Sequence, residues 1–466
     1  MLPFQGSEFF LWLISDPIVQ GLLSLTLPIV FGTISSSTQQ EDGILKDYYE
    51  DFISEHTNNK VPLSDLFRWE QAEYAGRAVE YRAHVTRNVS PMFVGEDGAF
   101  ADAGAQGHIP VRIQQRKMMA RIRMTSESMY DSRKSEGAYV SNKKDEMSRI
   151  VDDIARREEY AINTIGNGVL AFVDDSDPDS SATVTVDSPG GIANDNFGNR
   201  FILEGMYVGF VNPATGVLRS GVRRVASVST DGTSIVLDSA AGSTVADNDY
   251  IVQVANSSVT DVLDSSFEKA FRGFMGLVDD GTYVNNYDGV DRSVYGNHAS
   301  YVKASTGALS TDVLQQVSDA VSQKLGGMIT RVVGHHSTRR LFIQLTDPDR
   351  RYGGDRLTNP DPLTRAFTQD DLTMGEVPFT AIRDFPLDVM GFIDEKGADF
   401  VRYGTEKGKW VDEDGRILIR VGTGSAGRDA FEAWYRKRYQ NHCRQPAKCA
   451  RLDGITGHSL IVVRAE

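Results

Sequence analysis

The sequence predicts an α+β fold in which extended segments, one long helix and a separate β module share a chain of 466 residues. Apolar residues recur at helical spacing over 136–165, which predicts the long helix. Short apolar runs separated by turns rich in glycine and aspartate predict the β module over 172–256. The chain is 40% hydrophobic and 24% charged. Such a composition is ordinary for a soluble globular protein and excludes a disordered or collagen-like chain.

Acidic residues outnumber basic ones. The chain has 64 Asp and Glu against 49 Lys and Arg, which gives a formal net charge of −15. Because phosphate binding needs a basic surface, this balance excludes a general nucleic-acid binder, and any contact with DNA or RNA has to be local. The two cysteines, Cys443 and Cys449, predict a protein that does not rely on disulfides.

The first segment, 1–88, is expected to form an arm. An apolar run without charge covers 18–34, at the lower edge of the length that spans a bilayer. No Lys or Arg precedes Lys46, so the basic flank of a secretory signal is missing. We therefore expect this run to pack on another subunit or to be removed on maturation, with a membrane or signal role as the weaker alternative. A helix, broken at Pro62, is predicted over 44–82.

The next segment, 89–124, is predicted to be a long exposed hairpin, because four glycines fall between Phe93 and Ile109. Its expected return arm, 113–124, and the residue before it are strongly basic. The basic side chains are Arg112, Arg116, Lys117, Arg121 and Arg123. No aromatic residue that could stack on a base lies between them, so contact with a partner protein is favoured over contact with nucleic acid.

The long helix is expected to dominate 125–171 and to end at Gly166 and Gly168. The β module that follows is predicted to be a small barrel or sandwich, inserted into the chain and able to fold by itself. Its expected strands are 183–186, 206–211, 222–228, 234–237 and 250–254.

The rest of the chain is predicted to be mixed α/β over 257–400, followed by a segment of strands and a helix over 401–466. In the first part we expect a helix over 313–325, strands at 329–333, 377–382 and 389–393, and a long polar loop over 347–376. In the second part we expect strands at 416–421 and 459–463 and a helix over 428–440.

One glycine motif matches a nucleotide-binding pattern. Gly422, Gly424 and Gly427 form G-x-G-x-x-G between a predicted strand and a predicted helix, the context that a dinucleotide fingerprint requires. Too few residues follow it for a doubly wound sheet. We therefore expect a backbone turn that binds no nucleotide.

Three further clusters contain residue types that occur in metal or catalytic sites. The spacing of His442, Cys443, Cys449 and His458 fits no common zinc pattern. The run from Asp175 to Asp179 lacks the glycine and glutamate of a calcium loop. The adjacent His335 and His336 point to opposite faces of a strand. No catalytic, cofactor or metal site is therefore predicted, and the chain is not expected to be an enzyme.

The order of several stretches resembles a known family. These are RNVSPMFVGEDGAFADAGAQG at 87–107, RIRMTS at 121–126 and YAINTIGNG at 160–168, followed by 309–316, 377–381 and 410–415. In this order, over roughly 44–466, the chain resembles the HK97-like major capsid proteins of tailed bacteriophages. No single stretch is diagnostic, and the specificity comes from their order and spacing.

The resemblance implies an HK97-like capsid fold with an N-terminal arm, an E-loop hairpin, a spine helix in a peripheral domain, an inserted β-barrel or sandwich and an axial domain. It implies a shell subunit that forms the hexamers and pentamers of an icosahedral head around double-stranded DNA, with little specific DNA binding. The five basic residues named above would then contact a neighbouring subunit.

The resemblance also implies partners and a location. The partners would be other copies of the chain, with decoration, scaffolding and portal proteins as further candidates, and not a membrane. The location would be the virion, after assembly in the host cytoplasm. An encapsulin-like nanocompartment shell is the alternative, and an enzyme that uses the turn at Gly422, Gly424 and Gly427 is a more distant one.

Overall fold

The computed structural model describes residues 62–70, 78–131, 142–175, 181–193, 197–219, 221–346, 373–374, 377–412, 416–421 and 428–457. Nearly all of them belong to one compact unit, His56–Met129 with Lys143–Glu466. The apolar run 18–34, most of the polar loop, the glycine turn 422–427 and the expected strand 459–463 lie outside the described residues. In the described part, no helix is long and apolar enough to cross a membrane.

A five-stranded sheet joins three remote parts of the chain. Its strands are β1 (Arg68–Glu70), β4 (Arg116–Thr125), β19 (Phe400–Trp410), β20 (Ile419–Arg420) and β21 (Ala430–Cys443). The order is β1-β19-β21-β20, and β4 also pairs with β21, antiparallel over ten residue pairs. The strand β21 is therefore the centre of this sheet.

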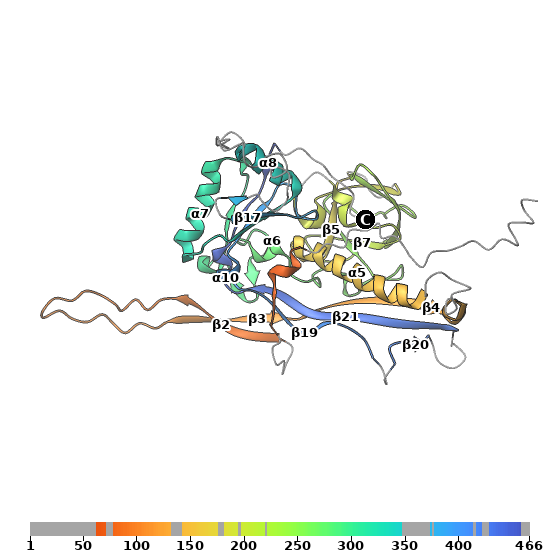
Figure 1. Cartoon of the computed structure of the whole chain (residues 1–466), viewed down its shortest axis with the longest axis horizontal. Coiled ribbons are helices and arrows are strands. Elements are labelled where there is room, and N and C mark those ends of the chain that lie inside the picture. Colours follow the sequence, from red (N-terminus) through yellow and green to blue (C-terminus); the bar gives the residue numbers. More distant parts are fainter. Residues whose placement is uncertain are drawn as a thin grey trace, which may run out of the picture. The chain divides into compact units, whose positions relative to one another are not determined.

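The long helix α5 (Asn142–Asn163) lies alongside this sheet (Figure 1). Its apolar side chains Met147 and Ile150 pack on Ile122 and Met124 of β4. Gly166 and Gly168 follow α5 with φ of 81° and 83°, a backbone region that favours glycine. The predicted long helix and its glycine ending are confirmed from residue 142 onward. A short helix, α4 (Ser126–Asp131), lies between β4 and α5 in the chain.

A hairpin formed by β2 (Ala78–Thr86) and β3 (Gly107–Gln114) precedes β4. Between the two strands, residues 87–106 form no helix or strand. Figure 1 shows the hairpin extending away from the labelled helices. The base of the hairpin has its own small core, in which Val111 and Ile113 pack with Val290 and Val401.

The inserted β module is a closed six-stranded barrel, with strand order β10-β5-β6-β9-β8-β7. Its strands are β5 (Val169–Val173), β6 (Thr183–Asp187), β7 (Tyr207–Val211), β8 (Arg223–Val228), β9 (Ser234–Leu237) and β10 (Tyr250–Gln253). The five strands expected from the sequence are confirmed to within about one residue at each end. The sixth, β5, lies mostly before residue 172, and Tyr160 of α5 also belongs to the barrel core.

A second, six-stranded sheet has the order β13-β22-β18-β15-β17-β16. Its strands are β13 (Tyr301–Lys303), β15 (Arg331–Gly334), β16 (Thr373–Met374), β17 (Val377–Ala381), β18 (Met390–Ile393) and β22 (Ala450–Leu452). Two helices, α7 (Thr311–Leu325) and α8 (His336–Thr346), contribute to its core. The predicted helix over 313–325 is confirmed. It begins at a Ser310 cap and ends at Gly326, which has a φ of 65°.

Short elements connect these parts. They are α6 (Phe274–Leu277), α10 (Glu395–Ala398), the strand pairs β11 (Asn286–Tyr287) with β12 (Val290–Asp291) and β14 (Gly307–Ala308) with β23 (Ile455–Thr456), and the 3-10 turns Ser64–Leu66, Pro189–Gly191, Gly198–Phe201, Val262–Asp264, Gly296–His298 and Pro446–Lys448.

Two helix predictions were wrong. The segment predicted as a helix over 428–440 is the strand β21, and the end of the helix predicted over 44–82 contains β1 and β2. In β21 the aromatic residues occur at helical spacing, but they are strong strand formers, and pairing with β4 and β19 on both sides decides the outcome. In β2, Val79, Tyr81 and Ala83 alternate with exposed residues, as a strand requires.

Candidate inter-subunit surfaces

The structure does not keep the five basic residues of the expected return arm together. Arg112 lies on β3, which is the true return strand of the hairpin, and faces solvent. Lys117, Arg121 and Arg123 lie on β4, which pairs with β21 and not with the hairpin. Arg116 also lies on β4, but it is partly buried opposite Tyr439, and burial, followed by the charge of Arg272, lowers its pKa.

The open face of the β4–β21 sheet is basic. Alternate residues of a strand share one face, and residues directly opposite in an antiparallel pair share it too. Ile122 and Met124 face the helix α5, so the residues between them face away from it. The basic residues on this open face, called the basic face below, are Lys117, Arg121, Arg123, Lys409, Arg436 and Arg438, and the acidic ones are Glu406 and Glu432.

Ion pairs neutralise only part of the basic face. Glu432 lies 3.9 Å from Arg121 and 4.0 Å from Arg123, which are 63% and 44% exposed. Glu406 forms a bidentate pair with Arg436, with both distances 2.6 Å. Because exposed pairs as long as those of Glu432 each contribute only about 0.2–1 kcal/mol, Arg121 and Arg123 stay available to a second partner.

The tip of the hairpin has the opposite character. Between 88 and 106 it contains Glu96, Asp97 and Asp102 and no Lys or Arg. Phe93 and Phe100 are 104% and 89% exposed, so both rings are in water. The tip is held by short internal contacts, such as the Asn88 side chain donating to the carbonyl of Gly104 at 2.9 Å. It is therefore an acidic and apolar projection, not a basic one.

A buried polar chain fixes the base of the hairpin. The Tyr81 hydroxyl lies 2.8 Å from Nε2 of His442, and Nδ1 of His442 lies 2.8 Å from Asp288. Burial lowers the pKa of His442, so its ring is neutral, donates to Asp288 and accepts from Tyr81. Although burial opposes it, the charge of Arg272, 2.6 Å away, lowers the pKa of Asp288 to about 2.

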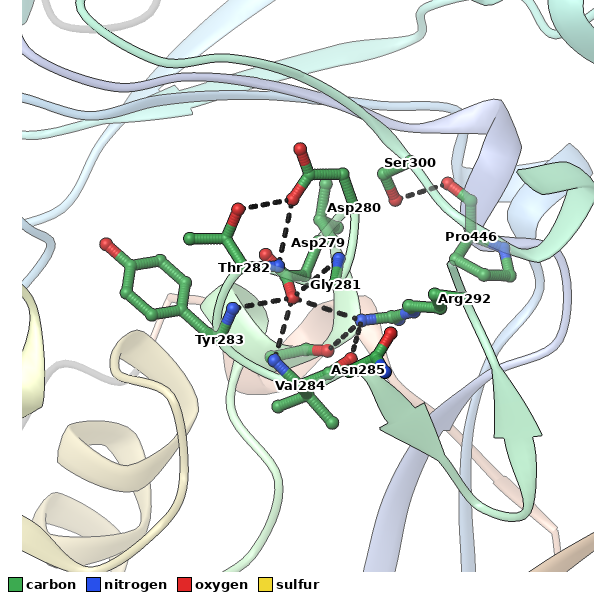
Figure 2. A network of polar contacts seen from close by, with 12 residues as sticks. Asp279, Asp280, Gly281, Thr282, Tyr283, Val284, Asn285, Arg292, Ser300 and Pro446 are labelled. Carbon is green, nitrogen blue, oxygen red and sulfur yellow. Dashed lines mark hydrogen bonds and ion pairs between the residues drawn. The ribbon is translucent and has the colours of Figure 1, made fainter. Parts of the chain in front are cut away.

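A second buried polar network surrounds Asp279 (Figure 2). One oxygen of its carboxylate accepts from the backbone N–H groups of Gly281, Tyr283 and Val284 at 2.9–3.1 Å. Arg292 and Arg451, both fully buried, lie 3.5 and 3.3 Å from the two carboxylate oxygens.

These two arginines also donate to backbone carbonyls of α6 and of Val278, the residue after it. The network thus connects β22 to the segment 275–292. In that segment, Val290 packs against the base of the hairpin.

The residues considered for chemistry give no reactive arrangement in the described ranges. No group of three or more His, Cys, Asp and Glu side chains there is placed to hold a metal ion. Both cysteines are buried and free. The glycine motif follows β20 and precedes β21, and Val421 and Ala430 are joined by a backbone hydrogen bond of 2.9 Å. A strand therefore follows the motif where a dinucleotide fingerprint needs a helix.

No protein-family model and no curated protein sequence matches this chain. Among solved structures, the capsid of cyanophage A-1(L) matches with 8% identity and a TM-score of 0.51, over 89% of this chain and 98% of the other. The chain has the fold of a phage capsid protein. This confirms the α+β capsid fold that the resemblance implied.

Two further solved shells are similar at lower scores. The capsid of a native GTA particle matches with 10% identity and a TM-score of 0.48, over 90% of this chain and 99% of the other. An encapsulin complex from Synechococcus elongatus matches with 9% identity and a TM-score of 0.42, over 91% and 98%.

The sequence analysis missed the acidic tip and the partners of β4. The tip acids were visible as a run without Lys or Arg between 88 and 106. The basic face could not be recognised, because it forms only when β4 pairs with β21, about 300 residues later in the chain.

Proposed function

We propose that this chain is the major capsid protein of a tailed phage. Its copies would form the hexamers and pentamers of an icosahedral head that encloses double-stranded DNA. In a chain with the capsid fold, the observation that carries the proposal is the hairpin tip, which exposes two phenylalanine rings to water.

The tip needs a partner surface. A two-stranded hairpin is at best marginally stable alone in water. The tip adds Val89, which is 87% exposed, to the two exposed rings. Exposed apolar groups gathered in this way mark an interaction site. In a shell, a neighbouring copy of the chain would supply the partner surface for every hairpin tip.

The basic face of a neighbouring copy is the surface that fits this tip. It presents Lys117, Arg121 and Arg123 from β4, while the tip presents Glu96, Asp97 and Asp102. The proposed contact keeps these three basic residues in an inter-subunit role. In this contact the hairpin is the acidic partner, whereas the sequence predicted a basic return arm for it.

Negative-stain electron microscopy of the purified chain tests the proposal. The parent is expected to form closed shells, and Phe93→Ser with Phe100→Ser is expected to leave unassembled subunits with an unchanged Tm, because both rings are exposed. Val294→Ser, at a residue 66% exposed and outside the hairpin, serves as the control and should assemble normally. Normal shells from the double variant, or no shells from the parent, would count against the proposal.

The proposal also assigns partners and a location. The subunit would act in the virion after assembly in the host cytoplasm, and decoration, scaffolding and portal proteins would be its further partners. Particles purified from infected cells should contain DNA. Particles that contain a protein cargo instead would favour a nanocompartment shell.

A further inference from the structure

A cavity of about 230 Å³ lies among residues of the segment 64–69, α5, β19 and β21. Aromatic rings form part of its wall, namely Phe67, Trp69 and Tyr439. The cavity is separate from the basic face, because Glu158 of α5 lines it and α5 covers the opposite face of the sheet.

Positive charge exceeds negative charge in this cavity. Arg402, Lys407 and Lys437 line it together with a single carboxylate, Glu158. Glu158 lies 3.0 Å from Arg402 and also binds Lys437, and the side chains of all three are at most 13% exposed. One carboxylate therefore balances two shielded cations, and Lys407 adds a third positive charge. Shielded charges such as those of Arg402 and Lys437 are costly to remove from water unless they are balanced.

Tyr439 provides a buried hydrogen-bond donor. Its side chain is 1% exposed and lines the cavity. Its hydroxyl lies near the Glu158 carboxylate, but no hydrogen bond of normal length and angle joins it to a described residue. A buried hydroxyl without a partner costs free energy. Burial, followed by the charge of Glu158, raises the pKa of Tyr439 well above its ordinary value, so the hydroxyl keeps its proton.

We propose that this cavity binds an oxyanion of the carboxylate or phosphate class, held by Lys407, Lys437 and the Tyr439 hydroxyl. An oxyanion offers acceptors only, which matches the donors of Lys407, Lys437 and Tyr439 in the cavity. It also balances the excess of positive charge, which a water molecule cannot do. The aromatic wall could also contact an apolar part of the ligand, but binding of the oxyanion does not depend on such a part.

The position of the site gives binding a structural effect. Phe67 and Trp69 come from the segment that contains β1, whereas Lys437 comes from the central strand β21. An anion between them would add a second link between this edge segment and the central strand, beside the pairing of β1 with β19. Binding to the folded state alone raises stability, so the ligand is expected to raise the Tm of the subunit.

The test uses the full chain with Phe93→Ser and Phe100→Ser, which is expected to stay as unassembled subunits. Sodium phosphate and sodium acetate are the probes, and sodium chloride at equal ionic strength is the reference. Phosphate or acetate is expected to raise the Tm with saturation and to give one site per subunit by calorimetry. The probe that binds more tightly identifies the ligand class. A shift that follows ionic strength alone, or that does not saturate, would overturn the proposal.

Three variants separate the site from general charge effects. Tyr439→Phe removes only the hydroxyl, and Lys407→Gln removes one cation at a side chain that is already exposed. Each is expected to weaken binding about tenfold, as for the loss of one hydrogen bond to a charged group. Lys409→Gln makes the same charge change on the same strand outside the cavity and should leave binding unchanged. An equal loss in Lys409→Gln, or none in Lys407→Gln, would refute the assignment. The readout does not depend on shell formation.

Discussion

Glu159 of α5 should make the stability of the subunit depend on pH. Its side chain is buried, with 1% exposed. One oxygen accepts from the backbone N–H of Leu63 at 3.1 Å and from Asn163 at 3.4 Å, whereas the other has no hydrogen-bond partner among the described residues. Burial raises the pKa of Glu159 from 4.5 to about 7, and the charges of Asp384 and Glu158 add to the effect.

The sign follows from proton binding. The folded state holds the proton of Glu159 more tightly than the unfolded state, so the stabilising contribution is complete below pH 4.5 and is lost as the pH rises through about 7. Each pH unit between the two pKa values corresponds to roughly 1.4 kcal/mol. The full loss from this group is therefore about 3 kcal/mol.

Glu159→Gln removes this dependence. The amide keeps an oxygen that can accept from Leu63 but cannot ionise. We expect the variant to gain up to about 3 kcal/mol in free energy of unfolding at pH 8 and to change little at pH 4.5. Urea denaturation at a series of pH values between these limits measures both.

Glu158→Gln is the matched control. Glu158 is ion-paired with Arg402 and Lys437, and removing one partner of a buried pair costs about 3–5 kcal/mol. At pH 8 the two neighbouring substitutions should therefore change stability in opposite directions. If Glu159→Gln loses stability at pH 8, ionisation of the buried carboxyl does not destabilise the folded state, and the reasoning is refuted.

Three further predictions concern the barrel, the basic face and the base of the hairpin. A fragment of 172–256 lacks most of β5 and should give a random-coil circular dichroism spectrum. A fragment of 160–256 contains β5 and should melt cooperatively. If both fragments behave alike, the barrel does not depend on β5. Arg121→Glu with Arg123→Glu should reduce shell formation at low salt and less at high salt, with the Tm retained; unchanged light scattering would mean that the basic face is only solvated. Asp288→Asn should cost about 3–5 kcal/mol in denaturation at pH 7, and a loss below about 1 kcal/mol would contradict the buried pair. In the parent, the pH-linked part of this contribution, roughly 2.5 kcal/mol, should be lost as the pH falls from 3.8 toward about 2.

Local patterns predicted the elements that depend on local interactions. The strands of the barrel and the helix α7 were predicted because alternation, apolar spacing and turn residues all act within a few residues. The strand β21 was not found, because its aromatic residues also fit a helical period. Its real determinants are β4 and β19, and β4 lies about 300 residues away in the chain.

The sequence predicted which basic residues the candidate surfaces contain, but not how these residues are arranged. The basic residues of 112–123 were identified, but which of them share a face depends on the register between β4 and β21. Arg116 shows this most directly, since it lies next to Lys117 and yet faces the other side of the sheet. The cavity at Tyr439 left no signal in the sequence, because its lining residues come from four separate stretches of the chain.

The pairing of β4 with β21 also has a consequence for the timing of synthesis. The strand β4 is made about 300 residues before its partner. At roughly 5–20 residues per second, a ribosome needs about 15–60 s to cover that distance. During this interval the neighbouring hairpin can exist while the basic face does not. Under the proposed contact between the tip and the basic face, an unfinished chain would expose a tip before it has a basic face. Two unfinished chains on adjacent ribosomes would then lack the surface needed to join.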